Sequence, residues 1–110
     1  MEGRPLVGTV MVDAARYSVE KTFDTIIVDG RICNADVDYN RARIRLSGKA
    51  DVLGEGREAQ VLMHEIVHAM LHERARTEEA EDEELVDALA AGFVNLVRQN
   101  LELVEFIRQS

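Results

Sequence analysis

The hydrophobic pattern of the chain changes its period near residue 50, and this change constrains the fold more than any other feature. Before residue 50, apolar and polar residues tend to alternate, which is typical of β-strands; after it, apolar residues recur at three- and four-residue spacing, which is typical of amphipathic helices. Gly54 and Gly56 mark the junction. Strands followed by helices predict an α+β fold with a small N-terminal antiparallel sheet. At 110 residues, the chain is expected to form a single domain, residues 1–110.

Strand signals recur through the first half of the chain. The stretch from Leu6 to Val12 is rich in Val and Thr, and residues 17–22 alternate by two. Residues 26–28 are apolar and run into Asp29-Gly30, a dipeptide that favours a tight hairpin turn. We therefore expect several short strands that are joined by turns.

The clearest strand signal is the segment Arg41–Leu46. Its arginines Arg41, Arg43 and Arg45 fall on one face, and Ala42, Ile44 and Leu46 fall on the other. This pattern predicts a half-buried antiparallel strand that ends at Ser47-Gly48 and carries a solvated arginine face. If the strand were a free edge, it would also be a candidate to pair with an extended peptide.

Two long helices are predicted in the second half. The first runs from about Arg57 to Arg74, and Thr77 is a plausible N-cap for the second. Residues 101–107 either continue the second helix or form a short final one. The apolar stripe of the second helix contains Leu85, Val86, Leu89, Ala90, Phe93, Leu96 and Val97.

Residues 64–68, His-Glu-Ile-Val-His, form the pattern HExxH inside the first predicted helix. Residues i and i+4 lie one turn apart on the same face, so His64 and His68 can converge on one zinc ion. Glu65 is then placed to act as general base towards a zinc-bound water, whose pKa falls to about 7. The alternative to a metal site is that the two histidines are simply a hydrogen-bonded polar pair on the helix. Two of the three histidines of the chain fall in this pattern, which favours the metal site.

A catalytic zinc ion usually has three protein ligands and one open position. His72 is a weak candidate for the third ligand, because a residue eight positions after His64 lies about 12 Å further along the helix. It is expected to lie in the second shell around the metal, on the surface or in the pocket wall.

The acidic run at residues 78–84 offers better candidates, although such runs are usually solvated helix starts. Glu83 lies at the edge of the apolar stripe and can face the first helix. Asp87, one turn later, can hydrogen-bond the outer nitrogen of a ligating histidine. Glu84, Glu79 and Asp82 remain alternatives to Glu83.

Charge and cysteine usage exclude several classes of function. The chain has 13 basic and 21 acidic residues and a formal net charge of −8, which argues against nucleic acid as a partner. Cys33 is the only cysteine, so an intrachain disulfide is excluded. The absence of an apolar run of 18 residues argues against a membrane span. We expect a cytoplasmic protein.

Together, these segments resemble the small ImmA/IrrE-like zinc metallopeptidases, especially the short phage and prophage versions. The resemblance covers roughly residues 36–97 and is carried by Asp38-Tyr39 with the Ile44/Leu46 strand, by residues 61–72, and by residues 83–90. In gluzincins, a glutamate ligand is often followed four residues later by an aspartate, as Glu83 is by Asp87.

The resemblance implies that the substrate is a peptide or protein, which in the larger members of the family is a repressor. Many relatives have Gly where this chain has Val67, and His72 and Tyr39 are the only candidates for an oxyanion-stabilising residue. A non-catalytic, zinc-stabilised domain that binds a protein is the alternative. A third interpretation, an acidic helical adaptor without metal, would require the HExxH pattern to be accidental.

Overall fold

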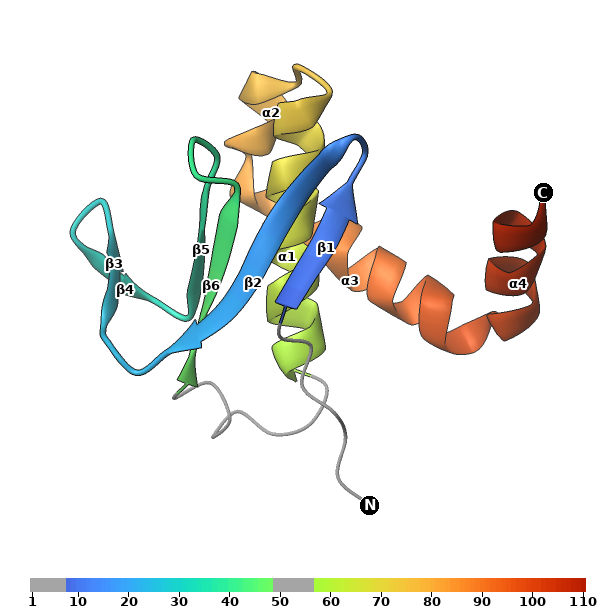
Figure 1. The fold of residues 1–110 in the computed structure, drawn as a ribbon, viewed down its shortest axis with the longest axis horizontal. Coiled ribbons are helices and arrows are strands. Elements are labelled where there is room, and N and C mark those ends of the chain that lie inside the picture. Colours follow the sequence, from blue (N-terminus) through green and yellow to red (C-terminus); the bar gives the residue numbers. More distant parts are fainter. Residues whose placement is uncertain (1–7, 49–56) are drawn as a thin grey trace.

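A computed structural model describes residues 8–48 and 57–110 of the chain (Figure 1). The first range forms the strands β1 (Gly8–Val12), β2 (Ala15–Thr22), β3 (Ile26–Val28), β4 (Arg31–Cys33), β5 (Ala35–Asp38) and β6 (Arg43–Ser47). The second range forms the helices α1 (Arg57–Glu73), α2 (Thr77–Ala80), α3 (Glu83–Gln99) and α4 (Leu101–Gln109). Strands precede helices, which confirms the predicted α+β class. Leu6, Val7, Gly54 and Gly56, which supported predictions, lie outside the described residues.

The main sheet has the strand order β1-β2-β6-β5 over residues 8–48. β1 is antiparallel to β2, and β5 is antiparallel to β6, as the sequence predicted for a small antiparallel sheet. β2 and β6 are parallel, with Val19 opposite Ile44. β2 and β6 are not consecutive in the chain, because the three short strands β3 to β5 lie between them. These strands form the connection that lets β6 run in the same direction as β2.

The predicted strand Arg41–Leu46 is present, but its neighbours differ from the expectation. β6 begins at Arg43, because Ala42 adopts a left-handed backbone conformation (φ 48°) in the preceding turn. β6 lies between β2 and β5, so it is an interior strand and not a free edge. β5 is the outer strand of the described sheet on this side. With four residues, β5 is too short for its alternation to be recognised in the sequence.

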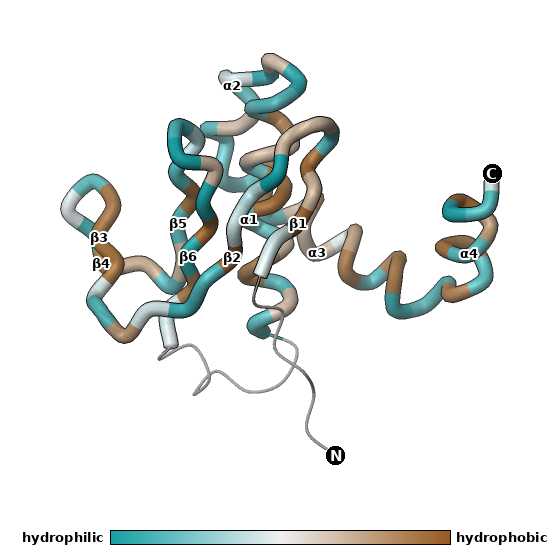
Figure 2. Tube along the Cα trace, viewed as in Figure 1, coloured by the Kyte–Doolittle hydropathy of each residue, from teal (hydrophilic) through white to brown (hydrophobic). Residues whose placement is uncertain are grey.

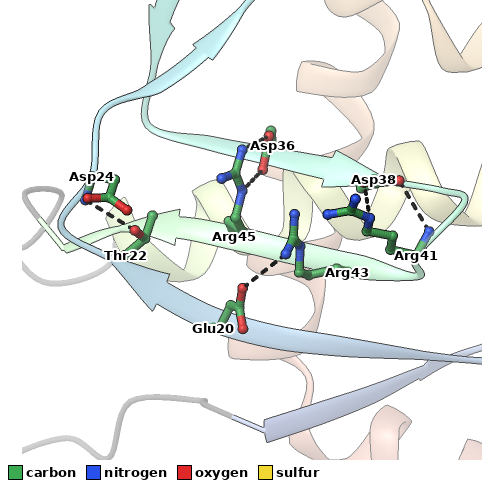
Figure 3. Close-up of polar contacts among 8 residues, drawn as sticks. All are labelled: Glu20, Thr22, Asp24, Asp36, Asp38, Arg41, Arg43 and Arg45. Atoms are coloured by element: carbon green, nitrogen blue, oxygen red, sulfur yellow. Dashed lines mark hydrogen bonds and ion pairs between the residues drawn. The ribbon is translucent and has the colours of Figure 1, made fainter.

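The arginine face of the sheet is paired with acidic side chains on the neighbouring strands (Figure 3). Arg45 donates two hydrogen bonds to Asp36 of β5, at 2.9 Å from Nε to Oδ1 and 2.5 Å from Nη2 to Oδ2. The other two pairs are Arg43 with Glu20 and Arg41 with Asp38, both at 3.8 Å. The arginines therefore connect β6 to both neighbouring strands, and the face is not simply solvated.

β3 and β4 form a separate hairpin beside the main sheet (Figure 1). Asp29 (φ 52°) and Gly30 (φ 77°) connect the two strands and place Ile27 opposite Ile32. Two successive residues with positive φ form the primed turn that suits the right-handed twist of a hairpin. The turn predicted from Asp29-Gly30 is confirmed.

α1 packs between the sheet and α3, which gives the protein three layers. The core between α1 and the sheet includes Tyr17, Ile44 and Leu62, and the core between α1 and α3 includes Val67 and Val86. Because α1 buries residues on both sides, its apolar residues cover most of its circumference. The hydroxyl of the buried Tyr17 also donates a hydrogen bond of 2.8 Å to Glu73 Oε2 at the end of α1.

The predicted first helix is confirmed within one residue, but the start of the second is wrong. Thr77 begins the short helix α2, and α3 begins only at Glu83. Asp82 is the N-cap of α3, where its Oδ1 accepts a hydrogen bond of 3.1 Å from the backbone N–H of Leu85. α4 is a distinct final helix. Among the described residues, no helix is long and apolar enough to cross a membrane.

Candidate metal centre

Two helices contribute the side chains of the candidate site. His64 and His68 lie one turn apart on α1, and Glu83 is the first residue of α3, which packs beside α1. The break between α2 and α3 matters here, because it starts α3 at the level of the two histidines. The sequence places Glu83 in an acidic run, but the packing of α3 on α1 selects Glu83 from that run.

The ligand atoms of these three residues lie as close together as the ligands of one ion. His64 Nε2 is 3.1 Å from His68 Nε2 and 3.0 Å from Glu83 Oε2. His68 Nε2 is 3.1 Å from Glu83 Oε1. Two atoms that are each about 2.0–2.1 Å from a tetrahedral zinc ion are about 3.3 Å apart. The three residues therefore fit a zinc ion with little adjustment, and they form a group of possible metal ligands.

The outer nitrogens of both histidines are held by hydrogen-bond acceptors. His64 Nδ1 lies 2.7 Å from Asp87 Oδ1, and His68 Nδ1 lies 2.5 Å from the carbonyl oxygen of Ala80. A carbonyl and a carboxylate can only accept, so a proton on each Nδ1 satisfies both contacts. In that tautomer, both Nε2 lone pairs point at the same position, together with the carboxylate of Glu83. A cation at this position would be attracted by all three groups.

The other acidic candidates do not belong to the group of possible metal ligands among the described residues. Asp82 caps α3, Glu79 lies near Arg76 at 3.9 Å, and Glu84 is exposed. Asp87, the predicted partner of a ligating histidine, contacts His64. The structure thus brings Glu83 and Asp87 to the two histidines and leaves the alternatives out.

His72 does not join the ligand cluster. Its ring stacks on Tyr39, with centroids 4.0 Å apart and planes within 7° of parallel, and both residues line the same cleft as the ligands. This agrees with the helical geometry, which places His72 too far along α1 to share an ion with His64. Burial raises the pKa of Tyr39, and the negative charges of Glu65 and Glu83 raise it further. The phenol therefore keeps its proton at neutral pH.

Glu65 is buried beside the cluster and faces the same cleft. Burial raises the pKa of Glu65 to about 7, because a low-dielectric environment disfavours the carboxylate. His64 lowers this pKa, while Glu83 and Asp36 raise it. A carboxyl group with a pKa near neutrality can both accept and return a proton, as a general base must.

The cleft in front of the cluster is bounded by parts of the fold that are far apart in the sequence. Its lining includes Val37 of the edge strand β5 and Ile27 and Ile32 of the β3–β4 hairpin. Residues of α1 and α3 complete the cleft. All four residues of β5, the outer strand of the described sheet, line the cleft.

Two elements of the site were missed by sequence reasoning. The carbonyl group of Ala80 has no signature, because any residue at the end of α2 would supply a carbonyl oxygen. β5 was missed because a strand of four residues is too short for its alternation to be recognised in the sequence. Only the folded chain brings these elements to the histidines.

The fold and the site thus define an α+β protein with a His-His-Glu cluster at the side of an open cleft. Comparisons with protein-family models, with curated proteins and with solved structures found no match.

Proposed function

We propose that the protein is a zinc-dependent metallopeptidase whose metal ligands are His64, His68 and Glu83. The observation that carries this proposal is the convergence of three residues, whose nitrogen and oxygen atoms approach one another to 3.0–3.1 Å while the outer nitrogens of both histidines contact other acceptors. The resemblance to short ImmA/IrrE-like metallopeptidases supports the same function. A bound zinc ion would polarise the peptide carbonyl and lower the pKa of a water molecule.

The residues of the chain have distinct roles in this proposal. Glu65 accepts a proton from the attacking water and delivers it to the amine that leaves. Asp87 and the carbonyl of Ala80 hold the imidazoles of His64 and His68 in the tautomer that can bind metal. A peptide or an exposed protein segment, including one from a repressor-like protein, is the proposed substrate, because the cleft runs beside the edge strand β5.

The main alternative is a zinc-stabilised domain that binds a protein without cleaving it. Structural zinc sites usually have four protein ligands, whereas three residues form the cluster among those that the structure describes. A buried Glu65 with no catalytic role would also be costly to maintain. Both observations favour catalysis over a purely structural site.

The test compares metal content and hydrolysis in three proteins prepared without a histidine tag. The parent chain is expected to contain about one zinc per chain and to cleave an unfolded protein. Glu65→Gln keeps the shape but removes the base, so zinc content should persist while hydrolysis falls by about 10²–10⁴-fold. His64→Ala should lose zinc and hydrolysis together.

Each outcome separates two of the functions. If the parent binds no zinc on addition of the ion, the metal site does not exist. If zinc binds but Glu65→Gln hydrolyses as fast as the parent, Glu65 is not the base. If zinc binds but neither the parent nor Glu65→Gln hydrolyses protein substrates, the binding domain is favoured over the enzyme.

A further inference from the structure

The C-terminal part of the chain projects away from the three layers. α3 packs on α1 through its first half, whereas its last turn and α4 extend beyond the sheet and α1 (Figure 1). We call residues 96–110 the arm. Within the described chain, α4 has no buried residue, and it follows the end of α3 at a distance from the sheet and α1. The arm is therefore a feature that the candidate metal centre does not explain.

The arm exposes large apolar side chains on both of its helices. Figure 2 shows hydrophobic segments along the end of α3 and along α4. Phe106 is 69% exposed and Ile107 is 63% exposed. The remaining large apolar residues of the arm with high exposure are Leu96, Val97, Leu101 and Leu103.

The apolar area that these six side chains expose is at the upper end of what a monomer usually leaves in water. Free side chains of this size present on the order of 150–200 Å² each, so their exposed fractions correspond to roughly 600 Å². A nine-residue helix such as α4 is also only marginally stable unless its apolar face is buried. The amphipathic pattern of α4 is thus explained if another surface covers it.

The charges of the arm identify a suitable partner. The whole chain has a formal net charge of −8, which opposes association between two copies. The arm, by contrast, carries two arginines and two glutamates, Arg98, Arg108, Glu102 and Glu105, and is neutral. All four are exposed. A neutral, apolar surface with both signs of charge at its margin can pair with itself without repulsion.

We propose that the arm is a homodimer interface, in which the arms of two copies of this chain pack against each other about a twofold axis. In such a pair, the same surface is used twice, and the arginines of one arm can face the glutamates of the other. Covering roughly 600 Å² on each arm gives about 1,200 Å² in total, which is at the lower limit for a stable interface. This proposal is independent of the metal site and of the proposed function.

The arrangement leaves the candidate active cleft open. Glu83 is the first residue of α3, and the arm begins at Leu96, 13 residues further along the same helix. At 1.5 Å per residue, the two are about 20 Å apart along the helix. Dimerisation through the arm would thus leave His64 and His68 accessible in each copy.

The experiment measures the mass of the intact chain in solution by sedimentation velocity between about 1 and 100 μM, a range that suits an interface of modest area. The parent chain is expected to reach twice the mass of the monomer. The double variant Phe106→Glu and Ile107→Glu should weaken dimerisation by at least about 100-fold, because it places charges in the apolar interface. Circular dichroism should keep most of the helical signal of the parent, because any loss is confined to the nine residues of α4.

Ile27→Glu with Ile32→Glu is the matched control, because it makes the same change at two exposed isoleucines of the β3–β4 hairpin. This control should dimerise like the parent. A parent chain that stays monomeric throughout, as it would if the arm bound a different protein, overturns the proposal. A dimer that persists in the arm variant, or that is lost in the hairpin variant, overturns it as well.

A charge-reversal pair tests the pairing of the arms directly. Arg98→Glu with Arg108→Glu gives an acidic arm, and Glu102→Arg with Glu105→Arg gives a basic arm. Each protein alone should dimerise less than the parent because like charges face each other, and an equimolar mixture should form a heterodimer. A mixture that associates no better than its components would overturn the proposal.

Discussion

The two imidazole rings of the candidate site each have a hydrogen-bond acceptor beside the outer nitrogen. Asp87 fixes His64 and the carbonyl of Ala80 fixes His68, each through the nitrogen that faces away from Glu83. Preorganisation of this kind reduces the conformational entropy that binding must offset. The affinity for zinc should therefore depend on the residue that orients a ligand as well as on the ligands.

We predict an order of zinc affinity for three single variants in the acidic part of the chain. Glu83→Ala removes a ligand and should weaken binding the most. Asp87→Asn should weaken it by about 10–100-fold, because the loss is confined to the orientation of His64. Glu84→Ala, at an adjacent exposed glutamate, is the matched control and should bind zinc like the parent.

Titration against a competing chelator measures this order. An equal loss in Glu83→Ala and Glu84→Ala would mean that the general negative charge, and not a specific ligand, attracts the ion. A loss in Asp87→Asn as large as that in Glu83→Ala would make Asp87 a ligand instead of an orienting residue.

At the scale of elements, the strand that could hold a substrate is β5 and not β6, the predicted strand Arg41–Leu46, because β5 lies at the edge of the described sheet. Ser47 N–H donates to Asn34 C=O, at 2.7 Å, so residues 34, 36 and 38 direct their backbone groups towards β6. Ala35 and Val37, which alternate with them, direct their N–H and C=O groups away from β6. These groups are available to an added strand.

We predict that Val37→Pro lowers the hydrolysis of a peptide substrate at least about 10-fold, because it removes an outward N–H group while the hydrogen bonds to β6 are kept. Val37→Ala is the control, since it keeps the N–H group and loses only side-chain packing. The measurement is kcat/KM with circular dichroism and zinc content for each variant. If the two variants hydrolyse equally well, the backbone of β5 does not bind the substrate. A proline at Ile44, in the interior strand, would instead disrupt the sheet itself.

At the scale of the whole molecule, the candidate ligands connect two layers of a small domain. His64 and His68 belong to α1 and Glu83 belongs to α3, so an ion bound between them would hold the two helices together. A domain of 110 residues has a limited hydrophobic core, and a metal that binds only the folded state stabilises it by mass action.

We predict that zinc raises the melting temperature of the protein. At a free zinc concentration 100 times the dissociation constant, the folded state gains about 2.7 kcal/mol. For a domain of this size, that gain corresponds to an increase in Tm of roughly 10 °C. Thermal unfolding with zinc and with chelator measures the effect, and His64→Ala is the control that should not respond. An identical Tm for the parent in both conditions would contradict binding between α1 and α3.

The sequence alone determined that strands precede helices, the extent of α1 and the two histidines of the candidate site. The reason is physical: a change of hydrophobic period and the spacing of His64 and His68 are local properties that neighbouring residues encode. The Asp29-Gly30 turn was predictable for the same reason, since positive φ angles limit which residues can occupy it.

The tertiary structure decided which elements become neighbours. It placed β6 inside the sheet and β5 at the edge, because pairing between strands depends on the path of the whole chain. It selected Glu83 from an acidic run in which several carboxylates were suitable, because the phase of α3 is set by Val86 and Ala90 packing on α1. It also brought the Ala80 carbonyl to His68, a contact that depends on backbone position and not on residue type.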